Sequence, residues 1–593
     1  MINLFSSIYK RLVLETHRLI LYIQWKYFPC NFDIQISKYE LDVVFFRTLP
    51  PIPRIIGVNE KARCYRRGAL FILSNQNIDL DSPIDWHYDE HSKFRWEKGR
   101  WYKSYKIPPK LGIDVKRVWE KSRFNFLPTL ALDFANIESE ETFHSILTYL
   151  KSYNESNPPF SGVNWFYSMD VGIRMFNCVL SGRIIKGIDQ DCKDIEAEIK
   201  TNISTGYFHI INNLENYRGR TNNHYLCNLL GIASFLSVVN GREKYKSKAV
   251  ELIESFNSEV QKQINKDGSS FEGSFYYHRL SLECFLYTYI LITEIQSHFN
   301  INESVLPKTK LLISKMIDFY INVQFRGRLP AIGDNDSGVI FSLGLCHKKP
   351  NTEDRRVLPE LDTLISLILG SDSSNGLVEC SYKKLFKSIF PVFFSMNRIE
   401  CAENALLNKE SCEETYGCHV GRLYFSDCTI EIGSQENVKV RNYPCFGVVV
   451  IEFAEQKAYL KYSNLNGCHS HNDLFNFSIL SQDFDIDDNG TYEYSSFPKF
   501  NALNKSYISH NGPKDKCGIL VDYIDGNELF ANMFIGNNFV KACIEIKGVF
   551  IQREIKWSDN TLKVIDSSSL PLLDIVLDNK CFYQYGFLID CGV

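Results

Sequence analysis

The spacing of apolar residues changes once along this chain, and that change limits the folds open to it. From about residue 114 to 369, apolar residues recur every three or four positions, the period of one helix face. Beyond about residue 391 they alternate with polar residues, the period of a half-buried strand. Because helices and strands are segregated, the sequence predicts a multidomain α+β protein: an α-toroid-like or bundle domain followed by an antiparallel β-sandwich.

The individual segments follow from the same spacing. The helical period covers 115–124, 144–153, 169–180, 194–214, 226–239, 246–264, 279–298, 305–323 and 354–369. The strand period covers 418–425, 429–432, 446–453, 457–462, 474–480, 518–523, 542–547, 549–557 and 561–567. A chain of 593 residues is too long for one core. We therefore expect a lead-in over 1–105 packed on the helices, a helical domain over 106–390 and a sheet domain over 391–593.

Charge and cysteine content narrow the function. The net charge is -4 and no basic run stands out, which argues against a nucleic-acid partner. An anionic ligand would need locally placed basic residues. The 18 cysteines are scattered without Cys-x-x-Cys pairs, so free thiols in a reducing compartment are expected.

The N-terminal segment is amphipathic. Lys10, Arg11, Glu15 and Arg18 interrupt it before a long apolar run develops. We therefore expect no signal peptide and no transmembrane helix. A helix packed on the protein body is the simpler interpretation, and a surface-associating helix is the alternative. The expected location is cytoplasmic, with a periplasmic or cell-surface location as the alternative.

Two histidines separated by one residue, His469 and His471, stand in the strand-rich part of the chain. They share one face of a strand, or they reach one centre from a tight loop. Asp488 and His510 downstream could join one of them in a nitrogen and oxygen metal site. An isolated His-x-His pair is also common as chance surface polarity, so the pair needs support from other segments.

That support comes from a family resemblance spread over residues 85 to 570. Its segments are Lys116 to Arg123, Asn157-Pro158-Pro159 with Gly162, Trp165 and Arg174, Thr221-Asn222-Asn223-His224, Asp267 to Arg279, His469 to Asp473, Asp488 to Tyr492, and His510-Asn511. In this order they resemble the heparinase II/III-like superfamily of bacterial polysaccharide lyases. The resemblance implies an incomplete (α/α) toroid followed by an antiparallel β-sandwich. It also implies β-elimination of an anionic, uronic-acid-containing polysaccharide such as a glycosaminoglycan.

The resemblance assigns catalytic roles to four residues. Asn223 and His224 match the pair that neutralises the uronate carboxylate, which must happen before the C5 proton can leave. Tyr277 matches the proton donor, which is also the base in some members, and His469 matches the catalytic histidine of the second domain. The residues alone also allow Asn222 and Asn223 to be a helix N-cap and Tyr277 to be a core aromatic.

The resemblance also implies a metal site and a substrate-lining set. His471, Asp488 and His510 match the metal ligands, with Zn²⁺ as the expected ion, bracing the loop that holds His469. Asn472 and Asp473 could orient either histidine of the pair. The expected substrate-lining residues are Asn222, Arg174, Glu272, His278 and Arg279. For Arg174 and Glu272 a buried ion pair is the alternative.

The loop Asp334-Asn335-Asp336-Ser337-Gly338 lacks the full calcium-loop pattern. We interpret it as a loop at the edge of the cleft. The leading function is a polysaccharide lyase, with a catalytically silent polysaccharide-binding or surface-polysaccharide assembly protein as the main alternative. A glycoside hydrolase is a third possibility, and it would require two carboxylates across the cleft.

Overall fold

The structure is a computed structural model of the chain. It describes residues 2–45, 52–55, 57–71, 77–78, 84–188, 191–216, 219, 221–240, 242–302, 304–336, 338–343, 357–370, 377–396, 424–432, 438–465, 467–482, 484–488, 498–558, 560–575, 581–584 and 587–590. Four predicted features lie partly outside these residues: the loop over 334–338, the helix over 354–369, the strand over 418–425, and the part of the Asp488 segment beyond that residue.

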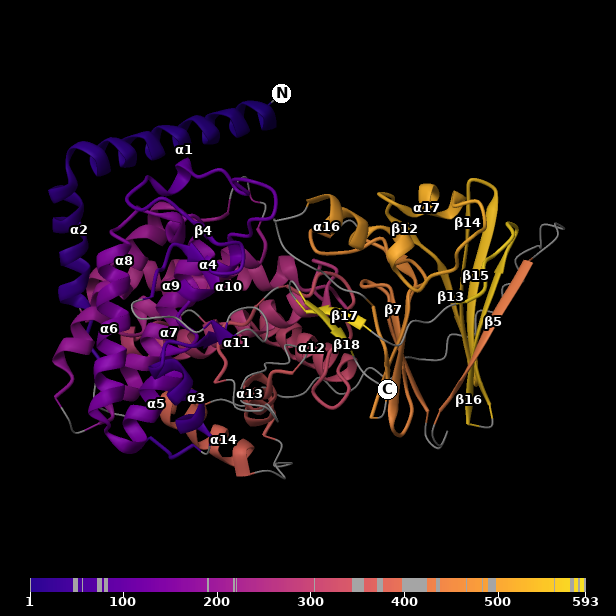
Figure 1. Ribbon diagram of the computed structural model, residues 1–593. Coiled ribbons are helices and arrows are strands. Elements are labelled where there is room, and N and C mark those ends of the chain that lie inside the picture. Colours follow the sequence, from indigo (N-terminus) through magenta and orange to yellow (C-terminus); the bar gives the residue numbers. More distant parts are fainter. Residues whose placement is uncertain are drawn as a thin grey trace.

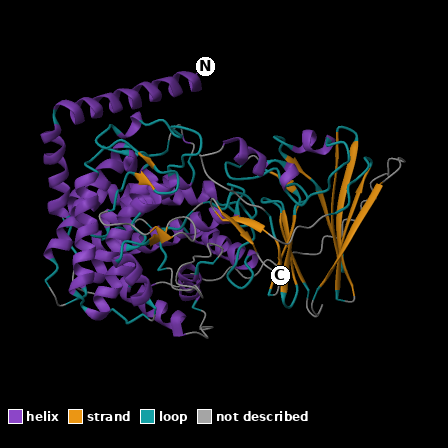
Figure 2. Cartoon of the chain, in the orientation of Figure 1, coloured by secondary structure: helices purple, strands orange, loops and turns teal. Residues whose placement is uncertain are grey.

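The first part of the chain is helical, as the apolar spacing predicts (Figure 1, Figure 2). Its helices are α1 (Ile2–Tyr27), α2 (Pro29–Asp42), α3 (Val58–Arg66), α4 (Lys116–Ser122), α5 (Leu127–Ile137), α6 (Glu140–Ser156), α7 (Ser168–Lys186), α8 (Lys193–Asn212), α9 (Asn223–Leu236), α10 (Arg242–Gln263), α11 (Phe275–Phe299), α12 (Pro307–Val323), α13 (Pro359–Leu369), α14 (Leu377–Ile389) and α15 (Pro391–Met396). Short strands β1 (Leu70–Phe71), β2 (Asn77–Ile78), β3 (Tyr88–Asp89) and β4 (Phe94–Arg95) and the 3₁₀ turns η1 (Tyr102–Ser104) and η2 (Val163–Trp165) lie between them.

Helices α7 and α11 are buried along almost their whole length. Both are buried on every side, so polar side chains such as Arg174 on α7 and His278 and Arg279 on α11 are enclosed together with the apolar ones. Ser274 caps α11 by accepting the backbone N–H of Tyr277. The cap fixes where the helix starts and therefore where the residues of its first turn lie.

The second part of the chain forms antiparallel sheets. Its strands are β5 (Tyr424–Glu431), β6 (Lys439–Tyr443), β7 (Val448–Glu452), β8 (Gln456–Lys461), β9 (Ser463–Asn464), β10 (Phe477–Ser481), β11 (Asp485–Ile486), β12 (Leu529–Phe530), β13 (Asn532–Ile535), β14 (Phe539–Ile546), β15 (Val549–Ser558), β16 (Thr561–Ser568), β17 (Cys581–Gln584) and β18 (Phe587–Asp590). One five-stranded sheet has the order β11-β10-β8-β7-β6, and the other has β13-β14-β15-β16-β5. Short helices α16 (Pro498–Lys505) and α17 (Ile519–Ile524) and the turn η4 (Tyr507–Ser509) lie in the connections.

Strand β7 explains how the two parts of the chain fit together. The sheet that contains β7 is called the inner sheet, and the sheet β13-β14-β15-β16-β5 is called the outer sheet. Val449 and Ile451 belong to the core between these two sheets, whereas Val448 and Val450 belong to the core of the helical part. A strand buried on both faces needs apolar residues at every position. The run 448–451 has that composition, and the inner sheet accordingly lies between the helices and the outer sheet (Figure 1).

Aromatic rings and backbone contacts close this junction. Phe446 stacks on Phe275 of α11 with ring centroids 5.0 Å apart. The hydroxyl of Tyr459 donates to the carbonyl oxygen of Val323 at 2.8 Å. One face of the sheet that contains β7 therefore belongs to the core of the helical part, while its other face belongs to a separate core.

The strand predicted over 518–523 is wrong, because this segment forms α17. Asp515 accepts the backbone N–H groups of Cys517, Ile519 and Leu520 at 2.9 to 3.1 Å. A carboxylate that binds the first N–H groups of a segment favours a helix start over a strand.

Helix α1 runs along the outside of the helical part (Figure 1). No helix among the described residues is long and apolar enough to cross a membrane.

Candidate active site

Segments from both parts of the chain meet at one point of the junction. The backbone N–H of His469 donates to the carbonyl oxygen of Glu272 at 3.2 Å, and that of Asp334 donates to the carbonyl oxygen of His469 at 2.8 Å. Gly273 has φ +76°, and a Cβ there would lie 2.7 Å from the Cβ of Ser470. A Cβ at Gly467 would lie 2.5 Å from the carbonyl oxygen of Glu272. Glycine is thus required on both sides of this contact.

The turn that starts α9 brings Asn222, Asn223 and His224 together. Asn222 caps the helix, because its side-chain oxygen accepts the backbone N–H of His224 at 3.1 Å. The side-chain amide of Asn223 donates to both carboxylate oxygens of Glu272, at 3.0 and 2.8 Å. Its Oδ1 atom is buried without a hydrogen-bond partner. The predicted N-cap is confirmed at Asn222, and Glu272 is held by an amide rather than by the alternative, a buried ion pair.

A carboxylate that the sequence did not single out, Glu215, controls His224. Its Oε1 lies 3.0 Å from His224 Nδ1. Burial lowers the pKa of His224, but the charge and hydrogen bond of Glu215 outweigh burial and raise the pKa above its usual value. The His224 side chain remains 24% exposed. It is thus a partly accessible imidazole that favours the charged form.

Tyr277 and His469 form the centre of the site. Their rings are stacked, with centroids 3.3 Å apart and an angle of 9° between the planes. The phenol hydroxyl donates to Asp336 Oδ1 at 3.0 Å. Lys116 binds the other carboxylate oxygen of Asp336 at 3.0 Å and donates to the backbone carbonyl of the same residue. A helical-part phenol and a sheet-part imidazole therefore lie face to face.

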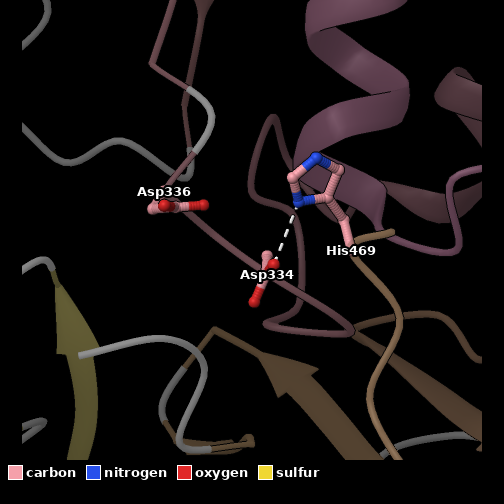
Figure 3. Close-up of side chains that lie close together, drawn as sticks. All are labelled: Asp334, Asp336 and His469. Carbon is pink, nitrogen blue, oxygen red and sulfur yellow. Dashed lines mark hydrogen bonds and ion pairs between the residues drawn. The ribbon is translucent and has the colours of Figure 1, made fainter. Parts of the chain in front are cut away.

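Asp334 joins both members of the histidine pair (Figure 3). Its two oxygens lie 3.0 Å from His469 Nδ1 and 2.9 Å from His471 Nε2, and Lys505 Nζ lies 2.6 Å away. Burial alone would raise the pKa of Asp334, but the hydrogen bonds from both histidines and the Lys505 charge hold it well below its usual range. An ionised carboxylate only accepts hydrogen bonds, so His469 donates Nδ1–H. In the neutral ring, Nε2 of His469 then keeps its lone pair.

Two residues expected to line the substrate, His278 and Arg279, lie inside the helical core instead. His278 is fully buried, accepts the backbone N–H of Ser270 at 3.2 Å and lies 3.2 Å from the carbonyl oxygen of Met316. Burial lowers its pKa to about 3, so a positive charge from this residue beside Tyr277 is excluded. Arg279 is buried 5.1 Å from the ring centroid of Tyr276.

Arg174 is buried between aromatic rings. Its guanidinium lies 4.8 Å from the ring centroid of Tyr153 and 5.0 Å from that of Trp165, and it donates to the carbonyl oxygen of Ser122 at 3.2 Å. The buried alternative therefore describes Arg174 better than the cleft-lining one. Its partners are rings and a carbonyl rather than an acid.

The expected metal ligands, His471, Asp488 and His510, all come from the sheet part of the chain. His510 Nδ1 is 2.7 Å from Asp488 Oδ2, and the rings of His471 and His510 have centroids 5.2 Å apart. Nδ1 of His471 and Nε2 of His510 are buried without hydrogen-bond partners. Buried imidazole nitrogens of this kind, whose rings are oriented by carboxylates, fit the donor set of zinc.

Another group of potential ligands is closer together. In the part of the chain that the structure describes, one trio of acidic and imidazole ligand atoms lies within 4.8 Å of one another: Asp334, Asp336 and His469 (Figure 3). Lys505 and Lys116 already bind these two carboxylates. The zinc set at His471, Asp488 and His510 stays a prediction.

Five residues that tune the site have no assigned role in the sequence motifs: Glu215, Asp334, Asp336, Lys116 and Lys505. The acidic loop at 334–336 is visible in the sequence as a loop at the edge of the cleft, but nothing in its spacing shows that it reaches the histidine pair. Lys116 lay within a matched segment without an assigned role. Glu215 and Lys505 gave no local signal.

Comparisons with known proteins support the helical part most directly. The family model for the heparinase II/III N-terminus matches residues 58–339. A crystal structure of a heparinase III is similar with a TM-score of 0.54 and 12% identity, over 91% of this chain and 75% of that chain. The heparan sulfate lyase HepC from Pedobacter heparinus matches with a TM-score of 0.40 and 14% identity, over 88% of this chain and 71% of that chain. No curated protein sequence matches the chain significantly. At this identity the heparinase III structure supports the fold alone.

Proposed function

We propose that this chain is a member of the heparinase II/III-like superfamily, whose N-terminal family model matches residues 58–339, and that it is a polysaccharide lyase that cleaves a uronic-acid-containing polymer by β-elimination. The proposal includes the finer architecture, in which the helices form an incomplete (α/α) toroid and the two five-stranded sheets form a β-sandwich. The observation that carries the proposal is the stacked pair of Tyr277 and His469, in which a phenol of the helical part lies on an imidazole of the sheet part.

Elimination first requires that the uronate carboxylate be neutralised. An ionised carboxylate resists the negative charge that develops when the C5 proton leaves. His224 is suited to this task because Glu215 raises its pKa and engages Nδ1, which leaves Nε2 for the ligand. Asn223 was expected to donate to the carboxylate as well. Its amide hydrogens are directed to Glu272 instead, and its buried Oδ1 can only accept a hydrogen bond, so this arrangement leaves the neutralisation of the carboxylate to His224.

Proton transfer then needs one base and one acid. With Nδ1–H donated to Asp334, His469 offers Nε2 as the base that removes the C5 proton. The C5–H electron pair forms the C4–C5 double bond, and the C4–O bond breaks. Tyr277 gives its phenol proton to the departing glycosidic oxygen. Until then the hydroxyl is held by Asp336, whose charge Lys116 offsets.

The expected zinc ion would stabilise the structure of the site rather than act as a Lewis acid in the reaction. His471, Asp488 and His510 would hold the ion, and it would brace the backbone segment shared by His471 and His469. Asp334 contributes to the same bracing, because it binds both histidines directly.

The test is product formation from a panel of uronides: heparosan, heparan sulfate, hyaluronan, chondroitin and alginate. A lyase generates a C4–C5 unsaturated end that absorbs in the ultraviolet, and at least one polymer should give this signal. New reducing ends without the chromophore would identify a hydrolase. Binding of a polymer without either product would identify a silent polysaccharide-binding protein.

A further inference from the structure

Helix α1 exposes apolar side chains on the face turned away from the protein. Its inner face is fixed to the body: Leu21 is buried, and Trp25 donates to the hydroxyl of Ser161 at 3.0 Å. The outer residues are large and exposed, namely Val13 (51%), Leu19 (57%), Ile20 (48%), Ile23 (40%) and Tyr27 (62%). A surface helix normally has a polar outer face, so α1 is apolar on the side where solvent is expected.

The outer residues lie on one face of the helix, where the exposed Thr16 separates Val13 from the others. Positions 13, 20, 23 and 27 are separated by seven, three and four residues, and 19 lies beside them. Single exposed apolar residues are ordinary on a protein surface, but a row of this kind along one helix face, called the outer stripe, marks an interaction site. Among the described residues, Phe28 and Ile34 extend the exposed apolar surface past the end of the helix.

Charge identifies the kind of partner. The α1 sequence contains four basic residues, Lys10, Arg11, Arg18 and Lys26, and one acidic residue, Glu15. Glu15 pairs with Arg18 at 3.4 Å, so the excess positive charge comes from Lys10, Arg11 and Lys26. The whole chain has a net charge of -4, so the helix is locally cationic on an acidic protein. An apolar stripe on a cationic helix fits a surface with apolar chains below an anionic layer.

We propose that α1 lies flat on an anionic phospholipid bilayer and inserts its outer stripe at the level of the headgroups. The helix is too polar to cross a membrane, which agrees with a helix that lies in the interface. A soluble anionic polysaccharide would engage the basic residues, but it would leave the aliphatic stripe exposed. This inference is independent of the proposed lyase activity, because none of the site residues lies on α1.

Co-sedimentation with vesicles tests the proposal on the full chain. The wild type should pellet with vesicles of phosphatidylcholine and phosphatidylglycerol, and much less with phosphatidylcholine alone. The double variant Ile20→Glu with Ile23→Glu should reduce the bound fraction at least tenfold. The matched control is Leu111→Glu, at a residue that is 74% exposed but lies off the helix, and it should bind as the wild type does.

Folding and self-association are separated by two further measurements. Circular dichroism melting should give the same midpoint for the double variant and the wild type, and a Ser pair at the same positions replaces the Glu pair if it does not. The proposal is overturned if the wild type stays in the supernatant with anionic vesicles, or if the folded double variant pellets equally well. It is also overturned if light scattering shows a dimer that the double variant converts to a monomer, because the stripe would then bind a second copy of the chain.

Discussion

Tyr277 of the helical part and His469 of the sheet part lie ring on ring, with centroids 3.3 Å apart and nearly parallel planes. The two side chains also reach neighbouring carboxylates on one loop, Asp336 and Asp334 respectively. The acid and the base of the proposed reaction are therefore positioned by the same three-residue segment, 334–336.

Replacing either member of the stacked pair should remove most of the activity. We expect Tyr277→Phe and His469→Ala each to lower kcat by about 10²- to 10⁴-fold, the usual contribution of a positioned acid or base. The double variant should be little worse than the singles, because the two groups act in one step. Tyr276→Phe is the matched control, since its hydroxyl donates to a backbone carbonyl, that of Leu329. A single variant with full activity would remove that residue from the reaction.

Glu215→Gln should shift the pH dependence of turnover. The raised pKa of His224 depends on the Glu215 charge, so the variant should lose the charged imidazole at lower pH than the wild type does. We expect the alkaline limb of kcat/KM to move to lower pH, with the larger loss of activity above neutral pH. Glu215→Asp, which keeps the charge, should restore much of the wild-type profile. An alkaline limb that stays in place in the Gln variant would show that His224 does not set it.

Asp334→Asn should destabilise the protein near neutral pH. The folded pKa of Asp334 is depressed, so its contribution is present above the unfolded pKa and is lost as the pH falls through the folded value. The variant should lose about 3 to 5 kcal/mol of unfolding free energy at neutral pH, as for a broken buried pair. The difference should shrink in acid. Denaturant unfolding over a pH series measures both effects.

The control for Asp334 is Glu251→Gln. Glu251 pairs with Lys248 at the surface, so this variant should change stability by about 1 kcal/mol or less. Equal losses in the two variants would contradict the buried network around Asp334.

Metal removal should loosen the loop that holds His469. We expect the purified protein to contain zinc, and His510→Ala to lower the metal content, the melting temperature and the activity together. His298→Ala is the control, because that ring contacts the carbonyl oxygen of Val239, far along the chain from the predicted ligands. Elemental analysis and thermal melting provide the readouts. Complete metal loss with an unchanged melting temperature would count against the bracing role.

The order of helices before strands could be predicted because apolar period is a local property. The 448–451 run showed a strand, yet it gave no hint that alternate residues would enter two different cores. The strand predicted over 518–523 is wrong for a similar reason. The short apolar run of this segment suited a strand, but the side chain of Asp515 accepts the first backbone N–H groups of the segment and favours a helix start.

In the candidate site, too, residues in local motifs could be predicted, whereas residues brought in by long-range packing could not. The residues in the recognised motifs were identifiable, and Tyr277 and His469 do meet in space. His278 and Arg279 were placed wrongly because they follow Tyr277 on a helix, where successive side chains point in different directions. Glu215 and Lys505 reach the site from other segments, and such contacts depend on tertiary packing that no local pattern contains.

Strand β7 couples the stability of the helical part to that of the sheet part, because its odd- and even-numbered side chains belong to different cores. Separating the sheet part from the helical part would expose Val448 and Val450 to water, because both side chains lie in the core of the helical part. Melting the helices would remove the cover from the same two side chains. Heat should thus unfold both parts in one cooperative transition, and the proposed acid and base should lose their alignment only when the whole chain does.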